Sequence, residues 1–237
     1  MPHRFKALTF DVFGTVVDWR SSVAAELQDF FAPRGVVRDW PQFILDWRAL
    51  YQPAMQAVRS GARDFVILDV LHRENLLVLL DRYEIAGLTP DEIDHLSQIW
   101  HRLVPWPDAV PGLARLKRSH ILATLSNGNI ALMVNLARFG GLPWDAILGA
   151  EFTRSYKPDP PTYLGTAAAL GLAPDQCLMV AAHNDDLHAA RAMGFGTAFI
   201  ARPTEYGPGQ TVDLEPDAAW DFATDSMTGL ADLLENA

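Results

Sequence analysis

The sequence predicts an α/β protein in which helices cover both faces of a mainly parallel β-sheet and an all-helical segment is inserted early in the chain. Apolar runs of strand length recur at residues 7–13, 121–125, 146–150, 177–182 and 196–200. Segments with helical periodicity separate most of these runs. Short buried strands that alternate with amphipathic helices indicate βαβ units and a parallel sheet.

The inserted segment follows the first strand. Residues 20–104 contain several helix patterns and no convincing strand. Residues 43–51 have apolar positions at helical spacing, and residues 65–71 begin a second helix of this kind. Thr89 and Pro90 form a further helix start, because a capping residue precedes a proline at the first helical position.

The chain then returns to the sheet. Three prolines within residues 105–111 predict a stiff connection at this point. We therefore expect a core domain of residues 1–19 and 105–237 and a cap domain of residues 20–104. The segment 203–216, which has several glycines, prolines and acidic residues, is predicted to be a surface loop before the final helix, and its sequence gives no information about chemistry.

Composition and charge limit the class of protein. The chain has 237 residues, with 49% hydrophobic and 20% charged residues, as in ordinary soluble proteins. The net charge of −10 argues against a nucleic-acid partner. No apolar stretch reaches membrane-spanning length, and the N-terminus leaves no room for a signal peptide. The single cysteine, Cys177, excludes an internal disulfide, so we expect a cytoplasmic location.

Polar side chains follow the ends of four predicted strands. In an open parallel sheet these positions line the ligand crevice. The four sets are Asp11 with Thr15, Ser126 with Asn127, Lys157 beyond the third strand, and His183 with Asp185 and Asp186. The sequence therefore predicts a single polar site at this edge of the sheet.

These residue types suggest covalent chemistry. An aspartate at a strand end is a candidate nucleophile, and a nearby Lys157 would favour the charged form of Asp11. Ser126 and Asn127 lie at a turn that opens a helix near residue 130, where they offer donors to a substrate anion. The pair Asp185-Asp186 could position a water, act as a base or bind a cation.

Together, these residues resemble those of a known family. The motifs are Asp11-Val12-Phe13-Gly14-Thr15, Ser126-Asn127-Gly128, Lys157-Pro158-Asp159 and Asp185-Asp186, with the helical insertion between the first and the second. In this order they resemble the haloacid dehalogenase superfamily and, within it, the type II 2-haloacid dehalogenases. The resemblance spans nearly the whole chain. It implies a Rossmann-like core with a helical cap, no cofactor, and a possible homodimer.

Phe13 distinguishes two branches of this superfamily. Its phosphatases carry a second aspartate two residues after the nucleophile, as general acid for the leaving alcohol. Phe13 occupies that position here. Halide leaves as a stable anion and needs no proton, so the aromatic residue fits the dehalogenase branch and would also desolvate the site.

The resemblance implies a two-step reaction. Asp11 displaces halide from C2 of a short 2-haloacid, either a haloacetate or an L-2-haloacid, and forms an aspartyl ester. Arg48, in a predicted cap helix, and Asn127 receive the halide. Water held near Asp186 then attacks the ester carbonyl, which releases a 2-hydroxyacid and restores the enzyme.

The remaining site residues support these steps. Thr15, Ser126 and Lys157 position the substrate carboxylate and the nucleophile, and Tyr163 supports the site. The last motif departs from the usual type II pattern, because His183 replaces an asparagine. We hypothesise that His183 orients water or shares the role of base with Asp186. The alternative is a histidine that only forms a hydrogen bond at a strand end.

Two other functions stay open from the sequence. One is a magnesium-dependent phosphatase of the same superfamily, since Asp11 and the pair Asp185-Asp186 could bind a cation together, although Phe13 weighs against it. The other is a non-catalytic binding module on this fold. The histidines lack the spacing of a zinc site, so we expect no resident metal.

Overall fold

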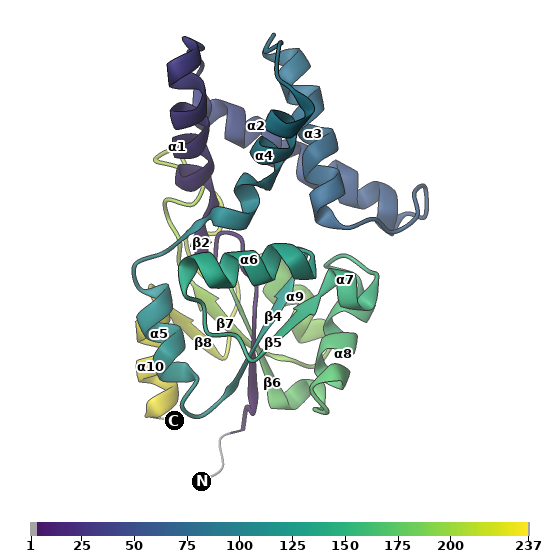
Figure 1. The fold of residues 1–237 in the computed structure, drawn as a ribbon. Helices are drawn as coiled ribbons and strands as arrows, with labels where there is room; N and C mark the ends of the chain where they lie inside the picture. The colour runs from purple at the N-terminus through teal and green to yellow at the C-terminus, as the bar shows by residue number, and fades with distance from the viewer. Residues whose placement is uncertain (1–3, 237) are drawn as a thin grey trace.

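The computed structural model describes residues 4–236 and confirms the predicted α/β fold (Figure 1). Within these residues, six strands form one parallel sheet in the order β5-β4-β1-β6-β7-β8. The strands are β1 (Ala7–Phe10), β4 (Ile121–Ser126), β5 (Ala146–Gly149), β6 (Cys177–Ala181), β7 (Gly196–Ile200) and β8 (Phe222–Thr224). Each of the five predicted runs contains a strand. The sequence did not predict β8, a three-residue edge strand that is only partly buried.

The order of the strands places β1 at the centre of the sheet. β1 pairs with β4 on one side and with β6 on the other. Ligands of open parallel sheets bind where the chain switches sides in this way, beyond the carboxyl ends of the strands. β1 ends at Phe10, earlier than the predicted residue 13, because the chain turns at Gly14, whose φ is +88°. Residues 11–13 therefore belong to the loop at this switch point.

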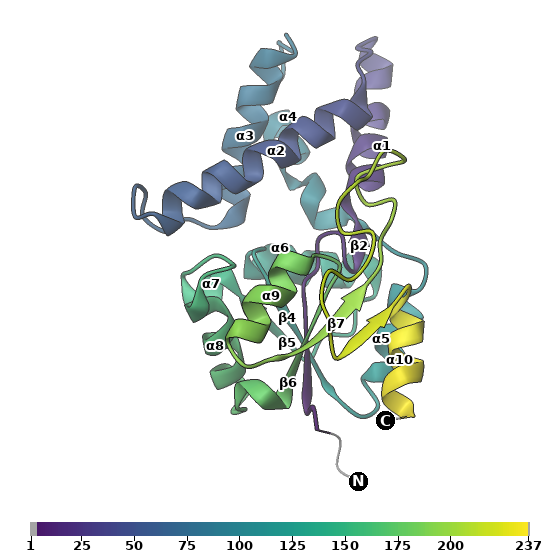
Figure 2. The same ribbon diagram turned by 180° about the vertical axis from the view of Figure 1, so that it is seen from behind.

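Helices cover the sheet on both faces (Figures 1 and 2). The side chains of Leu8 and Phe10 face an apolar layer that includes α5 (Ala109–Leu116), α6 (Ile130–Gly140) and α10 (Met227–Glu235). Ala7 and Met179 face the layer of α8 (Pro160–Ala169) and α9 (Asn184–Ala192). A short helix, α7 (Ala150–Thr153), follows β5. Alternate residues of a strand point to opposite faces, so both faces of β1 are buried.

The helical insertion stands beyond the carboxyl ends of the strands (Figure 1). It contains α1 (Trp19–Phe31), α2 (Trp40–Arg59), α3 (Leu68–Arg82) and α4 (Pro90–Ser97). Single turns of 3-10 helix lie at Ala32–Arg34, Gln98–Arg102 and, in the core, Pro174–Gln176. Thr89 caps α4 through a capping box with Glu92, as predicted for this helix start. α3 begins three residues later than predicted, at Leu68.

A short antiparallel ribbon joins the insertion to the sheet. It pairs β2 (Val17–Asp18) with β3 (Val104–Pro105). The predicted division into core and cap stays a prediction: its second boundary falls within β3, and its first falls in the first turn of α1, just after β2. No helix among residues 4–236 is long and apolar enough to cross a membrane.

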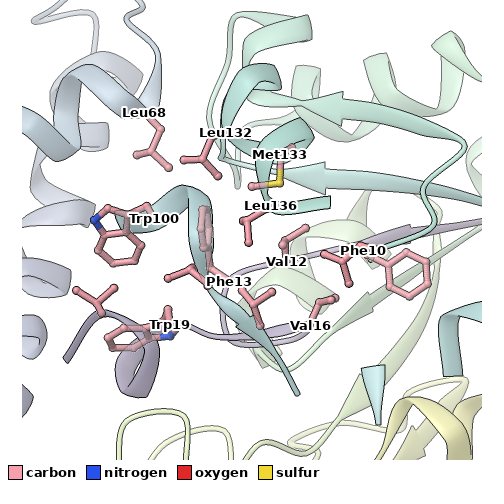
Figure 3. Close-up of a cluster of buried hydrophobic side chains, with 14 of the residues drawn as sticks. Phe10, Val12, Phe13, Val16, Trp19, Leu68, Trp100, Leu132, Met133 and Leu136 are labelled. Carbon is pink, nitrogen blue, oxygen red and sulfur yellow. The ribbon is translucent and has the colours of Figure 1, made fainter. Parts of the chain in front are cut away.

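Aromatic side chains fill the space between the insertion and the sheet domain (Figure 3). Phe13 is 3% exposed, and its ring lies edge-on to Trp100 with 5.9 Å between ring centroids. Trp100 in turn stacks on Trp19 at 6.3 Å. The same apolar cluster continues into α6 through Leu132 and Leu136. This packing provides a water-excluding wall behind Phe13.

Candidate active site

The carboxylate of Asp11 is held by donors on both of its oxygens. Asp11 comes directly after β1, and its backbone N–H donates to the carbonyl of Val180 at 3.0 Å. The Thr15 hydroxyl donates to Oδ2 of Asp11 at 2.8 Å, and Nζ of Lys157 donates to Oδ1 at 2.9 Å. The backbone N–H of Ala182 donates to the Thr15 hydroxyl at 2.8 Å, which fixes that hydroxyl toward Asp11. The first and last motifs are therefore joined at the nucleophile.

Lys157 connects Asp11 with a second buried carboxylate. Its ammonium also donates to Oδ2 of Asp186, which lies in the first turn of α9. The hydroxyl of Tyr163, on α8, donates to the other oxygen of Asp186 at 2.6 Å. The backbone N–H of Lys157 donates to Oδ1 of Asn127 at 2.8 Å, which joins the second and third motifs. The structure thus brings the predicted site residues of four strand ends together.

The electrostatics of this cluster favour an ionised nucleophile. Burial by itself would raise the pKa of Asp11, but Lys157 and His183 outweigh it and hold that pKa well below its ordinary range. Burial would lower the pKa of Lys157, but the carboxylates of Asp11 and Asp186 keep it raised. Burial, together with the charge of Asp11, raises the pKa of Asp186 against the effect of Lys157. At neutral pH, Asp11 is therefore a carboxylate beside a cation.

His183 lies between two carboxylates. It precedes α9, and its Nδ1 atom is 3.2 Å from Oδ2 of Asp11. Its Nε2 atom is 3.1 Å and 3.0 Å from the two oxygens of Glu205. Burial would lower the pKa of His183, but Glu205 and Asp11 outweigh it and hold that pKa well above its ordinary value. In the free protein His183 is therefore a cation.

Glu205 is the main site residue that the sequence did not predict. The segment 203–216 is a mostly exposed loop, as expected, but Glu205 within it is buried, at 1% exposed. The indole N–H of Trp19 donates to its Oε1 at 2.8 Å. Tyr206 and Asp213 from the same segment line the cavity described below. Glycines, prolines and polar residues are frequent in this segment, so its composition gave no sign that one glutamate is buried.

A cavity of about 640 Å³ opens over these residues, between α2 and the strand ends. Its lining includes the predicted residues Asp11, Phe13, Arg48, Asn127, Lys157, Tyr163, His183 and Asp186. Thr15 and Ser126 do not line it: Thr15 acts through its bond to Asp11, and the Ser126 hydroxyl accepts from the N–H of Gly128 at 3.1 Å. Ser126 therefore shapes the turn after β4, and its predicted contact with the substrate stays a prediction.

The cap contributes a cation to this cavity. Arg48 lies on α2, half-buried, with its guanidinium 4.1 Å from the centroid of the Tyr51 ring and 5.5 Å from that of Trp19. Within residues 4–236, Arg48 forms no ion pair at the distances of a salt bridge. A cation held over aromatic faces, with no carboxylate in direct contact among the described residues, can receive an anion.

Among the residues that the structure describes, no group of three or more His, Cys, Asp or Glu side chains is arranged to hold a metal ion. Asp11 and Asp186 both bind the ammonium of Lys157, and Asp185 is exposed at the cavity wall. Lys157 thus occupies the space between the two carboxylates.

Comparison with known proteins agrees with the motifs. A family model described as haloacid dehalogenase-like hydrolase matches residues 5–194. The chain belongs to this family. Among curated haloacid dehalogenase-like hydrolases, it is 32% identical over 206 residues to (S)-2-haloacid dehalogenase of Xanthobacter autotrophicus, which covers 83% of this chain and 75% of that protein. It is 29% identical over 216 residues to (S)-2-haloacid dehalogenase 4A of Burkholderia cepacia, with 87% and 88% covered.

Solved structures of the same family superpose closely. A defluorinating L-2-haloacid dehalogenase is 48% identical, with a TM-score of 0.96 over 98% of this chain and 95% of that one. A second L-2-haloacid dehalogenase is 45% identical, with a TM-score of 0.96 over 98% of this chain and all of the other. The resemblance inferred from the four motifs is thus confirmed, and so is the Rossmann-like architecture of a haloacid dehalogenase-like hydrolase.

Proposed function

We propose that this protein hydrolyses short 2-haloacids to 2-hydroxyacids through an ester on Asp11. The observation that carries the proposal is an ionised Asp11, paired with Lys157, that faces a cavity in which Phe13 replaces a general acid. Such a site suits a leaving group that departs without a proton. Similarity to enzymes named as (S)-2-haloacid and L-2-haloacid dehalogenases supports the substrate class.

In the first step, the Asp11 carboxylate attacks C2 of the haloacid and the carbon–halogen bond breaks. Attack from the side opposite the halogen inverts that carbon. Thr15 and Lys157 hold the carboxylate in place, and Arg48 and the amide of Asn127 receive the halide. The wall formed by Phe13 excludes water, which strengthens these charge interactions.

In the second step, water adds to the carboxyl carbon of Asp11, and the bond between that carbon and the ester oxygen breaks, so this oxygen leaves with the product. Asp186 lies beside the nucleophile, linked to it through Lys157, and Tyr163 orients it by a hydrogen bond. The products are a 2-hydroxyacid and the regenerated carboxylate. An (S)-2-haloacid would give the (R)-2-hydroxyacid, because only the first step changes the carbon centre.

Halide release tests the proposal. Purified protein is incubated with chloroacetate, fluoroacetate and each enantiomer of 2-chloropropionate, without added metal, and free halide is measured. Halide release that Asp11→Asn abolishes is the expected result. Magnesium-stimulated release of phosphate from an aryl phosphate, without halide release from any acid, would favour the phosphatase instead.

Isotope labelling tests the ester. With enzyme in excess over chloroacetate in ¹⁸O-water, the label enters Asp11 in the first turnover, because water attacks the carboxyl carbon. Label in the glycolate after a single turnover would contradict an aspartyl ester. If no acid is turned over at all, the alternative of a non-catalytic binding module would be favoured.

We also propose that the enzyme works in the reducing cytoplasm, where the free thiol of the buried Cys177 would persist. A homodimer stays a prediction based on the family resemblance. Sedimentation velocity of the purified chain would test it, because the molar mass obtained for a dimer is twice that of a single chain.

A further inference from the structure

Glu205 is a buried carboxylate that none of the four motifs contains. It lies in the loop after β7, 1% exposed, with one oxygen bound by the indole of Trp19. Its main cationic neighbour is His183, whose Nε2 atom is within 3.1 Å of both oxygens. A buried carboxylate is costly unless it is paired, so its place beside the nucleophile calls for a function.

We propose that Glu205 is a positioning residue that holds His183 as the proton acceptor for hydrolysis of the ester at Asp11. This inference rests on the proposed function and assigns the second step to a pair of residues, with Asp186 kept for holding Lys157. It adds a residue from a segment outside the family motifs. It also assigns a role to the histidine that replaces the usual asparagine at position 183.

The geometry orients the imidazole ring. Because Nε2 faces Glu205, a neutral His183 keeps its proton on Nε2 and has its free lone pair on Nδ1. Nδ1 is 3.2 Å from Oδ2 of Asp11 and so faces the carboxyl group that becomes the ester. His183 also lines the cavity, so a water beside the ester can reach it.

Asp186 is less suited to this role. One of its oxygens accepts a hydrogen bond from Lys157 and the other accepts one from Tyr163. Its link to Asp11 runs through the ammonium of Lys157, which donates to both carboxylates. A carboxylate in this position is well placed to fix Lys157, whereas the ring of His183 lies directly against Asp11.

The backbone around Gly14 accommodates Glu205. Gly14 has a φ of +88°, and a Cβ atom added there would lie 2.1 Å from Oε1 of Glu205. The turn after the nucleophile therefore needs a residue without a side chain to admit this carboxylate. Trp19, which also binds Glu205, is the first residue of α1, so Glu205 is anchored to the cap as well as to the loop.

The charge on Asp11 changes during the reaction, and this change affects the protonation of His183. The ionisable groups that face His183 are Asp11, Glu205 and Tyr206, with Arg48 acting on Glu205. In the free enzyme two carboxylates hold the proton on His183. When Asp11 becomes an ester it loses its charge, which lowers the pKa of His183 from its value in the free enzyme and favours release of that proton.

The step then balances. Neutral His183 takes a proton from water through Nδ1 while the water oxygen bonds to the carboxyl carbon of Asp11, and Glu205 stabilises the resulting imidazolium. The bond between that carbon and the ester oxygen breaks, and the imidazolium returns the proton to this departing oxygen. The new carboxylic acid of Asp11 finally transfers its proton to His183, which restores the free enzyme. One proton and one halide leave in each turnover.

Rapid-quench kinetics with chloroacetate test the proposal by separating the two steps. In Glu205→Gln, chloride release in the first turnover stays within about threefold of the wild-type rate, while ester hydrolysis slows at least about tenfold. The ester then accumulates on Asp11 and is seen by mass spectrometry of the digested protein. Glu215→Gln, in the same loop but exposed, is the matched control and leaves both rates unchanged.

Two further measurements keep the test decisive. A pH indicator in the same mixing experiment shows one proton released together with the first chloride, before glycolate appears. If Glu205→Gln does not fold, His183→Gln gives the same accumulation of ester. Glu205→Asp keeps the carboxylate on a side chain that is shorter by one methylene group. Its rate of ester hydrolysis lies between those of Glu205→Gln and the wild type.

Three outcomes overturn the inference. The first is ester hydrolysis at the wild-type rate in folded Glu205→Gln. The second is an equal loss of both steps, which would indicate a merely structural role. The third is a proton that appears only with glycolate. Failure of the wild-type protein to release halide from any acid would refute the proposed function itself, which distinguishes the two failures.

Discussion

The Nζ atom of Lys157 lies 2.9 Å from Oδ1 of Asp11, and both side chains are less than a tenth exposed. At this separation and burial the two charges depend on each other, because each would be expensive to bury alone. The same ammonium binds Asp186, so a single lysine bridges two carboxylates. This arrangement keeps a nucleophile ionised in a site from which water is largely excluded.

Replacing Lys157 with methionine removes that cation while keeping most of the side-chain volume. We expect the first-turnover rate of chloride release to fall at least about 100-fold, because a buried Asp11 without its partner binds a proton. Lys117→Met is the control, since Lys117 pairs with Asp145 at the surface. A variant that is folded by circular dichroism and retains the wild-type burst would contradict the role of Lys157.

The pH dependence of the first step follows from the pKa of Asp11. Only the carboxylate attacks, and Lys157 and His183 hold its pKa below the ordinary 3.8 against the effect of burial. The ionised fraction is therefore full above that value and falls only below it. We expect the rate of the chloride burst at pH 5 to lie within about twofold of that at pH 8. An acid limb centred above pH 5 in the burst phase would contradict this.

Phe13 tests the reason why this site lacks a general acid. Phe13→Asp would place a second carboxylate beside Asp11 in an aromatic pocket, where repulsion and burial favour protonation. We expect chloride release to fall at least about 100-fold, while Phe13→Leu stays within about tenfold because it keeps the site apolar. Chloride release and thermal unfolding are measured for both variants. Equal activity in the two would show that a carboxylate at position 13 does not impede the attack by Asp11.

Much of this site is predictable from sequence because strand ends are predictable. Parallel strands bring the positions just beyond their carboxyl ends to one edge of the sheet. Four predicted site residues lie at or near such positions: Asp11, Asn127, Lys157 and Asp186. Their order along the chain was sufficient to identify the family. Arg48 could be placed in a cap helix, although only the folded chain shows it over the same cavity.

Other features depend on tertiary structure that leaves little trace in the sequence. Glu205 is buried by Trp19 and His183, which are distant in the chain, so the local composition of its loop indicated an exposed residue. Ser126 was predicted to position the substrate carboxylate, which stays a prediction, and the sequence did not indicate that its hydroxyl also accepts from the N–H of Gly128. Turn chemistry of this kind competes with ligand binding for short polar side chains.

Arg48 provides a test of the halide site. Arg48→Gln keeps a polar side chain but removes the cation from the cavity. We expect chloride release to slow at least about tenfold and inhibition by added bromide to weaken, because the anion loses its main partner. Arg34→Gln, in the exposed pair with Glu92, is the control and should change neither. Unaltered bromide inhibition in Arg48→Gln would place the halide elsewhere.

Gly14 offers a test of the turn on which Glu205 depends. Two effects act against Gly14→Ala: a φ of +88°, which side chains rarely adopt, and a Cβ atom 2.1 Å from Oε1 of Glu205. Gly35 has a similar φ of +68° and no atom within 4 Å of such a Cβ, so Gly35→Ala measures the backbone effect alone. We expect Gly35→Ala to lower the free energy of unfolding by about 1 kcal/mol and Gly14→Ala by at least about 2 kcal/mol, as followed by urea unfolding. Because the added methyl group displaces Glu205 from His183, Gly14→Ala should also accumulate the ester. Equal losses of stability in the two variants, with ester hydrolysis unaffected, would show that the close approach of Glu205 to this turn has no energetic consequence.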